Sequence, residues 1–280
     1  MDIFKNRKLI IATKHKKEAV IAPLLEEKLG VNCFVDEHFD SDTFGTFSGE
    51  IERQNDALET VRAKCLAAME INNCDLAVAS EGSFGPHPNL YFAHADDEIV
   101  MLLDKKNQLE IVAREISLET NFDARLIKNK ADLVDFIQRV QFPSHALIVK
   151  KDKTDHSFLR KGIQQEKELM ECVESCFKNY GQAYIETDMR AMFNPTRMEV
   201  IKNLVNDLII EMNRICPSCN FPGFSVSDVV RGLLCSHCHW PTKSVKELVF
   251  TCKKCHFSSI EINAEKKMNE DPMYCEICNP

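Results

Sequence analysis

Apolar residues recur along the first 150 positions in two periods, and these periods predict alternating strands and helices. Short apolar runs bounded by polar residues are typical of buried strands, and they fall at 8–12, 31–35, 76–79 and 146–149. Apolar residues at helical spacing predict helices at 18–29, 55–71 and 131–140. The runs 99–103 and 109–113 flank a polar segment and predict an antiparallel hairpin. This pattern predicts an α/β fold, in which helices cover both faces of a mixed sheet.

The pattern changes after residue 150. Residues 160–180 are mostly helical in character, and Asn194-Pro195 begins a further helix because Asn caps helices and Pro suits their first turn. We therefore predict three regions along the chain. They are an α/β ligand-binding domain (1–150), a helical segment that packs on it or bridges from it (151–214), and a small C-terminal domain (215–280).

The C-terminal region contains four Cys-x-x-Cys pairs, which hold eight of the thirteen cysteines. Two thiolates three positions apart can bind one ion from the same side, and two such pairs complete a tetrahedral shell. Because no signal-peptide core precedes them, a metal is favoured over disulfides. We expect two structural Zn²⁺ ions. Their ligands are Cys216, Cys219, Cys235, Cys238, Cys252, Cys255, Cys275 and Cys278.

The spacing of the pairs predicts which of them share an ion. The gap between pairs one and two is 15 residues, and the gap between pairs three and four is 19. Both match zinc ribbons, so two tandem ribbons are predicted. A cross-braced arrangement, in which pair one joins pair three, stays open as the alternative. His237, His239 and His256 lie beside the pairs and are expected to be exposed neighbours of the site rather than ligands.

Composition and charge narrow the choice of partners. The chain has 44% hydrophobic and 28% charged residues, as in an ordinary globular protein, and its net charge is −8. Residues 216–280 carry seven basic and seven acidic residues, so the cysteine-rich region is neutral. Nucleic acid is therefore not the expected partner, because phosphate backbones attract clustered positive charge. No apolar stretch is long enough for a membrane span, and we expect a cytoplasmic protein.

Polar residues directly after the predicted strands form a candidate ligand cleft, since ligands of such sheets bind at the carboxyl ends of strands. Thr13, Lys14 and Lys17 follow the first strand and can donate to phosphate. The segment 80–86, which contains Glu81 and Ser83, is predicted to turn sharply after its strand. Glu81, joined by Glu59 from the preceding helix, can hold Mg²⁺ with carboxylate oxygens. Each of these residues alone also fits a structural role.

Two arginines near the start of the helix at 195 have two interpretations. Arg190 and Arg197 can bind a phosphate or carboxylate in bidentate fashion, or they can pair with Glu186 and Asp188 and so stabilise the helix start. Both interpretations stay open at this point.

The order of these motifs resembles the inosine/xanthosine triphosphate pyrophosphatase-like fold over residues 8–85. The similar segments are Ala12–Val20, Ser48–Glu50, Glu59–Lys64 and Ala77–Ser83. The resemblance implies that Thr13 and Lys17 contact phosphate and that Glu59 and Glu81 hold Mg²⁺. Two positions depart from the pattern, because Lys14 replaces an Asn and Ser83 replaces a second Gly.

The whole chain also resembles a bacterial domain family of unknown function. The shared features are an Ala-Thr-Lys-His start, a Ser-Glu-Gly-Ser-Phe-Gly-Pro segment and terminal Cys-x-x-Cys pairs. Two functions therefore stand side by side. The first is an Mg²⁺-dependent nucleoside triphosphate pyrophosphatase-like hydrolase. The second is a noncatalytic zinc adaptor, with the cysteine-rich region binding a protein or nucleic-acid partner.

Overall fold

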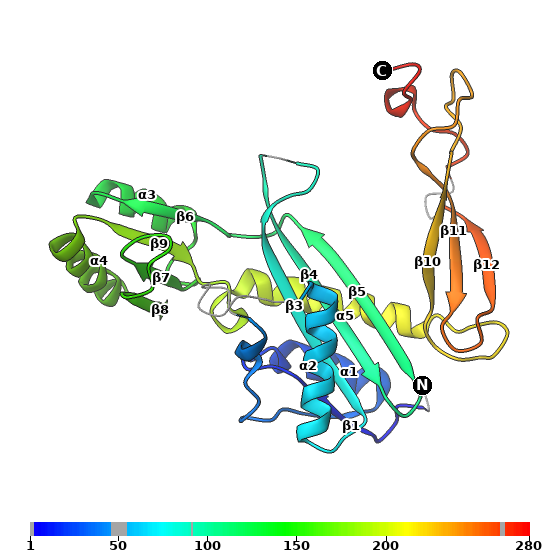
Figure 1. The fold of residues 1–280 in the computed structure, drawn as a ribbon, viewed down its shortest axis with the longest axis horizontal. Coiled ribbons are helices and arrows are strands. Elements are labelled where there is room, and N and C mark those ends of the chain that lie inside the picture. Colours follow the sequence, from blue (N-terminus) through cyan, green and yellow to red (C-terminus); the bar gives the residue numbers. More distant parts are fainter. Residues whose placement is uncertain (1–2, 46–54, 91, 264–266) are drawn as a thin grey trace. The chain divides into compact units, whose positions relative to one another are not determined.

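The structure is a computed structural model that describes residues 3–45, 55–90, 92–263 and 267–280 (Figure 1). Ser48–Glu50, a part of the pyrophosphatase-like resemblance, lies outside the described residues. The chain divides into two compact units. The first, the α/β unit, comprises 1–107 and 112–209, and the second, the cysteine unit, comprises 108–111 and 210–280.

The main sheet of the α/β unit is mixed, as the sequence pattern predicts. Its strand order is β2-β1-β3-β4-β5, in which β1 pairs in parallel with β2 and β3, and β3 pairs antiparallel with β4. The strands are β1 (Lys8–Ile11), β2 (Asn32–Phe34), β3 (Leu76–Pro86), β4 (His94–Asp104) and β5 (Leu109–Ser117). The predicted hairpin at 99–113 is thus confirmed, and its strands are longer than predicted.

Strand β3 corrects the sharp turn predicted at 80–86. It continues to Pro86 and pairs with β4 over its whole length. β1 ends at Ile11, opposite Val78, so the part of β3 from Ser80 onward extends past the end of β1. Backbone pairing with β4 satisfies the polar groups of this segment, which removes the need for a turn.

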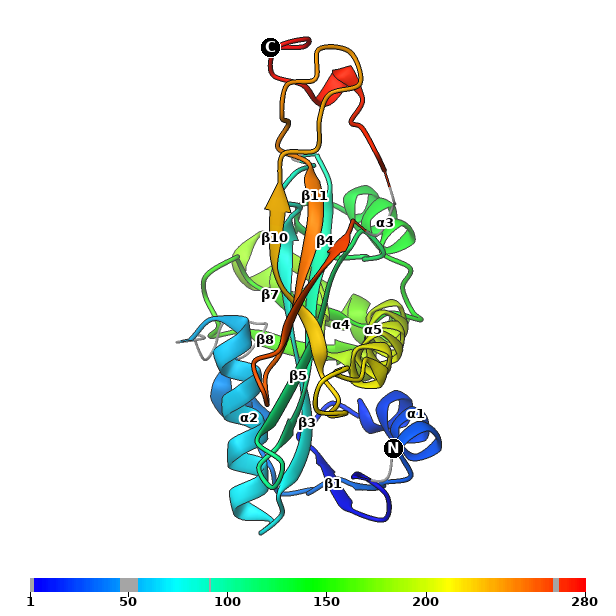
Figure 2. The same cartoon turned by 90° about the vertical axis from the view of Figure 1, so that its right-hand side faces the viewer.

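Helices cover both faces of the main sheet: α2 lies on one face, and α1 and α5 lie on the other (Figure 2). Their ends follow local capping rules, because Asp56 caps α2 and Gly30 ends α1 in the left-handed conformation. None of the helices in the described part of the chain combines the length and apolar composition of a membrane span. The three helices are α1 (Glu18–Leu29), α2 (Ala57–Ile71) and α5 (Pro195–Asn213).

A second, fully antiparallel sheet belongs to the same unit, with the order β6-β9-β7-β8. It contains the strand predicted at 146–149. This strand pairs with β8 and β9, which follow it in the chain, and not with a strand of the main sheet. Two strands therefore lie in the segment 151–214, which the sequence pattern predicts to be helical. The elements are β6 (Ala124–Ile127), α3 (Lys130–Arg139), β7 (Leu147–Lys150), β8 (Leu159–Ile163), α4 (Glu166–Tyr180) and β9 (Ala183–Thr187).

The cysteine unit is built on a three-stranded antiparallel sheet with the order β10-β11-β12. The strands are β10 (Phe224–Arg231), β11 (Val245–Cys252) and β12 (Ser258–Ile262). Its buried apolar cluster is small and contains two of the cysteines: Cys216, Phe224, Phe250 and Cys252. The described residues of the two units also include the short 3₁₀ helices η1 (Ser41–Phe44), η2 (Ala191–Phe193) and η3 (Pro272–Tyr274).

Candidate functional site

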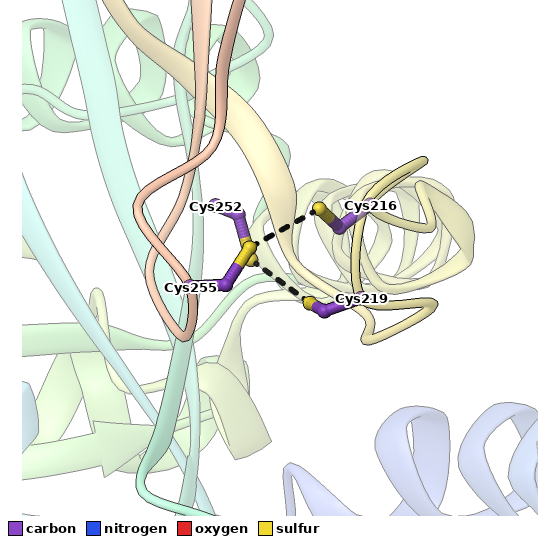
Figure 3. Close-up of side chains that lie close together, drawn as sticks. All are labelled: Cys216, Cys219, Cys252 and Cys255. Atoms are coloured by element: carbon purple, nitrogen blue, oxygen red, sulfur yellow. Dashed lines mark hydrogen bonds between the residues drawn. The ribbon is translucent and has the colours of Figure 1, made fainter.

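The eight paired cysteines form two separate tetracysteine groups, and in each group all four sulfur atoms lie within 4.8 Å of one another. A zinc ion with about 2.3 Å bonds to four sulfurs requires sulfur–sulfur distances of about 3.8 Å. Across the first group these distances are 3.6 Å for both Cys216–Cys255 and Cys219–Cys252 (Figure 3). Across the second they are 3.9 Å for Cys235–Cys278 and 3.5 Å for Cys238–Cys275. The donor set and its spacing fit a tetrahedral ion such as Zn²⁺.

The grouping overturns the tandem pairing predicted from the gap lengths. Pair one joins pair three, and pair two joins pair four, so the cross-braced alternative is the correct one. β10 separates pairs one and two, and a strand of eight residues spans about 26 Å. β11 then returns the chain to its starting end, where Phe224 lies opposite Cys252. Antiparallel pairing therefore places alternate pairs at the same end of the sheet.

All four knuckles share one backbone arrangement. The residue after the second cysteine donates its N–H to the carbonyl of the first cysteine, at 2.8–3.0 Å. In three of the knuckles this residue has a φ of 55° to 61°, a region in which Asn and His are enriched. The four residues are Asn220, His239, His256 and Asn279. His239 and His256 are thus exposed turn residues outside the tetracysteine groups, as predicted, and His237 is exposed as well.

All thirteen cysteines belong to the described residues, and none forms a disulfide. The backbone of a knuckle also acts on its thiol. The N–H of Phe257 is the largest cause that lowers the pKa of Cys255, to about 7, whereas burial is the largest cause that raises the pKa of Cys219, in the same group, to about 12. A lower thiol pKa favours the thiolate, which is the form that binds metal.

A second cluster lies in the α/β unit, where the carboxyl end of β1 meets the middle of the longer parallel strand β3. Thr13, His15 and Lys17 follow β1, Ser80 and Glu81 belong to β3, and Lys64 comes from α2. All six are buried and line one cavity of about 10 Å³, which has the room of a single water molecule. The predicted phosphate-binding residues Thr13 and Lys17 therefore lie beside the predicted metal ligand Glu81.

Both lysines of this cavity are held by buried partners. Lys64 forms an ion pair with Glu81. The Lys17 ammonium donates to the Ser80 hydroxyl at 2.6 Å and lies 3.6 Å from a Glu98 oxygen. Burial is the main cause that lowers the pKa of Lys17, to about 7, and the positive charge of Arg197 adds to it. The free amine and the ammonium of Lys17 are thus both populated near neutral pH.

The cavity also contains a histidine that the sequence patterns did not select. His15 Nε2 lies 2.9 Å from Asp42 Oδ1, and burial lowers the pKa of His15. The same contact with His15 is the largest cause that lowers the pKa of Asp42. An imidazole oriented by a carboxylate can accept a proton from water. The only sequence signal was the position of His15 within the first strand–helix turn, because Asp42 is 27 residues away.

The other residues predicted for the cleft lie apart from this cavity. Glu59 is exposed on the first turn of α2, because Thr60 and Lys64 occupy the inward face of that helix. Lys14 forms ion pairs with Asp40 and Asp42. Ser83 is half-buried, two positions beyond Glu81 on β3. The Mg²⁺ role predicted for Glu59 receives no support from this placement.

Of the two arginines, Arg190 follows one of the interpretations offered for it, whereas Arg197 pairs with Glu98, a partner that neither interpretation named. Arg190 pairs with Asp188 next to the start of α5, which is the structural alternative. Arg197 is buried and binds Glu98 through two hydrogen bonds of 3.0 and 3.1 Å. A third nitrogen of Arg197 donates to the Met189 carbonyl at 2.6 Å. Arg197 therefore places a buried positive charge near Lys17, and this charge lowers the pKa of Lys17.

Gly82 makes room for the Glu98–Arg197 pair. Gly82 lies opposite Glu98 across β3 and β4. A Cβ atom on Gly82 would lie 2.6 Å from an Arg197 nitrogen and closer still to a Glu98 oxygen. The glycine is therefore required by the close approach of the ion pair and not by a positive φ.

Lys17, Glu98 and Arg197 form an ion-paired cluster. A larger cavity of about 430 Å³ lies next to it. Phe84 connects the two, since the Arg197 guanidinium lies 5.1 Å from the centre of its ring. Aromatic rings, a thioether and polar groups from both sheets of the unit line this cavity. They are Phe84, His94, Phe122, Asp123, Ala124, Ile148, Lys153, Tyr184, Glu186, Thr187 and Met189. Its volume is typical of small-molecule sites.

The family model of a domain of unknown function (DUF6671) matches residues 64–280 of the chain. The match includes Lys64, Glu81, Glu98, Arg197 and all eight paired cysteines, but not Thr13 to Lys17. Among curated proteins none matches the chain.

Proposed function

The chain therefore belongs to the DUF6671 family, and from its geometry we propose that the α/β unit binds a nucleotide and hydrolyses a phosphoanhydride bond with Mg²⁺. The observation that supports this most is the convergence of Lys17, Lys64 and Glu81 on one cavity at the carboxyl end of β1, beside the middle of β3. Burying a charge costs several kcal/mol unless partners or a ligand offset that cost. Phosphate oxygens are the ligands that two neighbouring lysines suit best.

The residues around the cavity have different roles in such a reaction. The cavity has room for the attacking water, so Lys17 and Lys64 contact the phosphates once their side chains turn outward from it, and His15, oriented by Asp42, accepts a proton from that water. Glu81 offers the hard oxygen ligand that Mg²⁺ prefers, once Lys64 turns from Glu81 to a phosphate. When bound, Mg²⁺ supplies charge stabilisation for the phosphoryl group.

The aromatic cavity of about 430 Å³ accommodates the nucleoside part of the ligand. Successive contacts from Lys17 to Glu98, from Glu98 to Arg197 and from Arg197 to Phe84 connect the two cavities along one face of the β3–β4 hairpin. Phe84 and Phe122, whose ring centres are 5.8 Å apart, offer surfaces on which a planar base can stack.

Turnover of a nucleotide panel tests this proposal. The full chain is incubated with Mg²⁺ and each of the common nucleoside triphosphates, and the release of pyrophosphate and phosphate is measured. Glu81→Gln is expected to lower kcat about 100-fold or more, whereas Glu70→Gln, an exposed change on α2, leaves it unchanged. Glu59→Gln decides whether the exposed Glu59 contributes. Full activity of Glu81→Gln would contradict the proposal.

A second function has an observation of its own. The cysteine unit exposes large apolar side chains beside its second metal group, among them Leu234, Trp240, Met273, Tyr274 and Ile277. Trp240 and Tyr274 are 53% and 60% exposed. Exposed aromatic clusters of this kind mark protein interfaces. As the alternative function, we propose that this surface binds a protein partner.

The adaptor proposal is tested by cross-linking mass spectrometry on the full chain in its native cell extract. Cross-links from one identified partner are expected beside Trp240 and Tyr274. They are expected to disappear in the Trp240→Ala/Tyr274→Ala double variant and to persist in Ile71→Ala, which removes an exposed apolar residue of the α/β unit. A partner that binds both variants equally would count against this surface.

A further inference from the structure

Asp96 is a buried carboxyl group for which the functions proposed above give no role. It lies on β4 two residues before Glu98, so both side chains point to the same face of the sheet. Both residues are 0% exposed. Neither carboxyl oxygen of Asp96 has a hydrogen-bond partner among the described residues. Buried polar atoms without partners are rare in native proteins, so this group requires an explanation.

The charges around Asp96 come from three elements. Arg197 of α5 and Lys17, just before α1, are positive, and Glu98 of β4 itself is negative. The cations are committed elsewhere, since Arg197 binds Glu98 and Met189 and Lys17 binds Ser80. Across the strand pair, β3 offers only Phe84 opposite Asp96. Two carboxylates side by side in a buried site do not both ionise, and one of them keeps a proton.

Burial first, and then the negative charge of Glu98, raise the pKa of Asp96 to about 8. Arg197 donates two hydrogen bonds to Glu98, whereas Asp96 receives none among the described residues, and this difference favours the shared proton on Asp96. The pKa of Asp96 therefore agrees with the arrangement of its neighbours.

We propose that Asp96 is a neutral carboxylic acid that shares its proton with Glu98, and that Asp96, Glu98 and Lys17 form a proton relay to the ligand cavity. The relay follows contacts in the structure, because protonated Asp96 can donate to the neighbouring Glu98 carboxylate, Glu98 lies 3.6 Å from the Lys17 ammonium, and Lys17 lines the cavity. The neutral acid is independent of the proposed hydrolase. Only the use of its proton rests on that function.

Over one turnover, the number of protons on the protein is unchanged. Asp96 gives one proton to Glu98, Glu98 gives one to the amine of Lys17, and the Lys17 ammonium gives one to the leaving phosphate oxygen. The water that attacks the phosphoryl group releases one proton, which His15 accepts. Exchange of that proton through solvent returns Asp96 to the neutral acid, so the protein gains and loses none.

Infrared spectroscopy of the full chain tests the neutral acid without any ligand. A carbonyl band of a protonated carboxylic acid is expected at pH 6–7, and it should disappear above about pH 9 as Asp96 ionises. Asp96→Asn should remove this band. The matched control is Asp97→Asn, a neighbour on the opposite face that forms an ion pair with Arg114 and so contributes no such band. If Asp96→Asn does not fold, the pH titration of the unaltered chain, with isotopically labelled Asp, answers the same question.

The relay is tested by the pH profile of turnover. Asp96→Asn is expected to lower kcat about 100-fold, to leave KM unchanged and to abolish the change in kcat near pH 8. Absence of the acid band at pH 6–7 would overturn the proposal whatever the turnover. A band without any turnover in the unaltered chain would refute the relay and the hydrolase, but not the neutral acid.

Discussion

The two units of this protein solve the burial of charged groups in opposite ways. In the cysteine unit, eight sulfur atoms come from four local knuckles of the same design, and each group of four could be held together by one metal ion. In the α/β unit, single charged residues from β3, β4, α2, α5 and the turn after β1 neutralise one another inside apolar packing. Repeated local motifs are therefore easy to detect in a sequence, whereas a cluster assembled from distant elements is not.

Stability differs between the units for the same reason. The cysteine unit has a small buried cluster that includes its own metal ligands, so little apolar burial remains without the ion. The α/β unit packs α2 on the main sheet, and α3 and α4 on the second sheet, around extensive buried apolar clusters. We therefore expect the two units to respond differently to metal removal and to core substitutions.

Metal removal should have the largest effect on stability. It should unfold the cysteine unit and leave the α/β unit folded. Native protein is expected to contain two zinc ions per chain by elemental analysis. Structural zinc contributes about 10–16 kcal/mol to the folding of small domains, so a strong chelator should unfold the cysteine unit. Trp240, the single tryptophan, lies two residues after Cys238 and reports the loss by fluorescence. Simultaneous unfolding of the α/β unit, followed by circular dichroism, would contradict this difference.

The cross-brace is tested by zinc content in two double variants. Cys216→Ser/Cys252→Ser damages one centre twice, so one zinc per chain is expected to remain. Cys216→Ser/Cys235→Ser damages both centres, and the zinc content should fall towards zero. Tandem ribbons would produce the reverse result, which makes the pair of variants decisive.

The ion-paired cluster of the α/β unit should be sensitive to one added methyl group. Gly82→Ala forces its Cβ atom against Glu98 and Arg197, and it is expected to lower the free energy of unfolding by about 3 kcal/mol. Gly85→Ala is the matched control on the same strand, because no atom lies within 4 Å of its Cβ position. Urea unfolding measures the free energy of unfolding of both variants. Equal values would show that Glu98 and Arg197 move aside without a measurable loss of stability.

The smallest expected effect is that of Lys17 on the pH dependence of the free energy of unfolding. The unfolded chain keeps the Lys17 proton up to its ordinary pKa of 10.5, whereas the folded chain loses it near pH 7. Between these values unfolding takes up a proton, so Lys17 makes the free energy of unfolding rise with pH, by at most about 1.4 kcal/mol per pH unit.

Lys17→Met is expected to remove this rise between pH 7 and 9 in urea unfolding. Lys28→Met, at an exposed position of α1, should keep it. An unchanged pH dependence in Lys17→Met would show that Lys17 stays protonated in the folded chain over this range.

Several elements were predictable from local signals alone. The start of α5 followed from Asn194-Pro195, and the Asn194 side chain indeed accepts the backbone N–H of Arg197. The bounds of α1, predicted as 18–29, and the hairpin of β4 and β5 followed in the same way. Glu81 and Lys17 were selected because polar residues after parallel strands meet at one edge of a sheet, and the structure places both on one cavity.

Other parts of the site depend on pairs far apart in the chain. Glu98 and Arg197 are separated by 99 residues, and His15 and Asp42 by 27. Glu59 was selected by motif order, but the inward face of α2 carries Lys64 instead. A motif fixes which residue types are available, whereas the rotation of a helix on its sheet decides which of them enters the cavity.

The amino-acid sequence by itself determined eight cysteines in four knuckles that could bind two ions, because a Cys-x-x-Cys knuckle is a local structure whose geometry four residues specify. It also determined the mixed sheet and its covering helices, through the periods of its apolar residues. Only the tertiary structure decided which knuckles face each other and which charges share the interior. Both depend on strand direction and on packing between segments that are far apart in the chain, and spacing along the chain does not encode either.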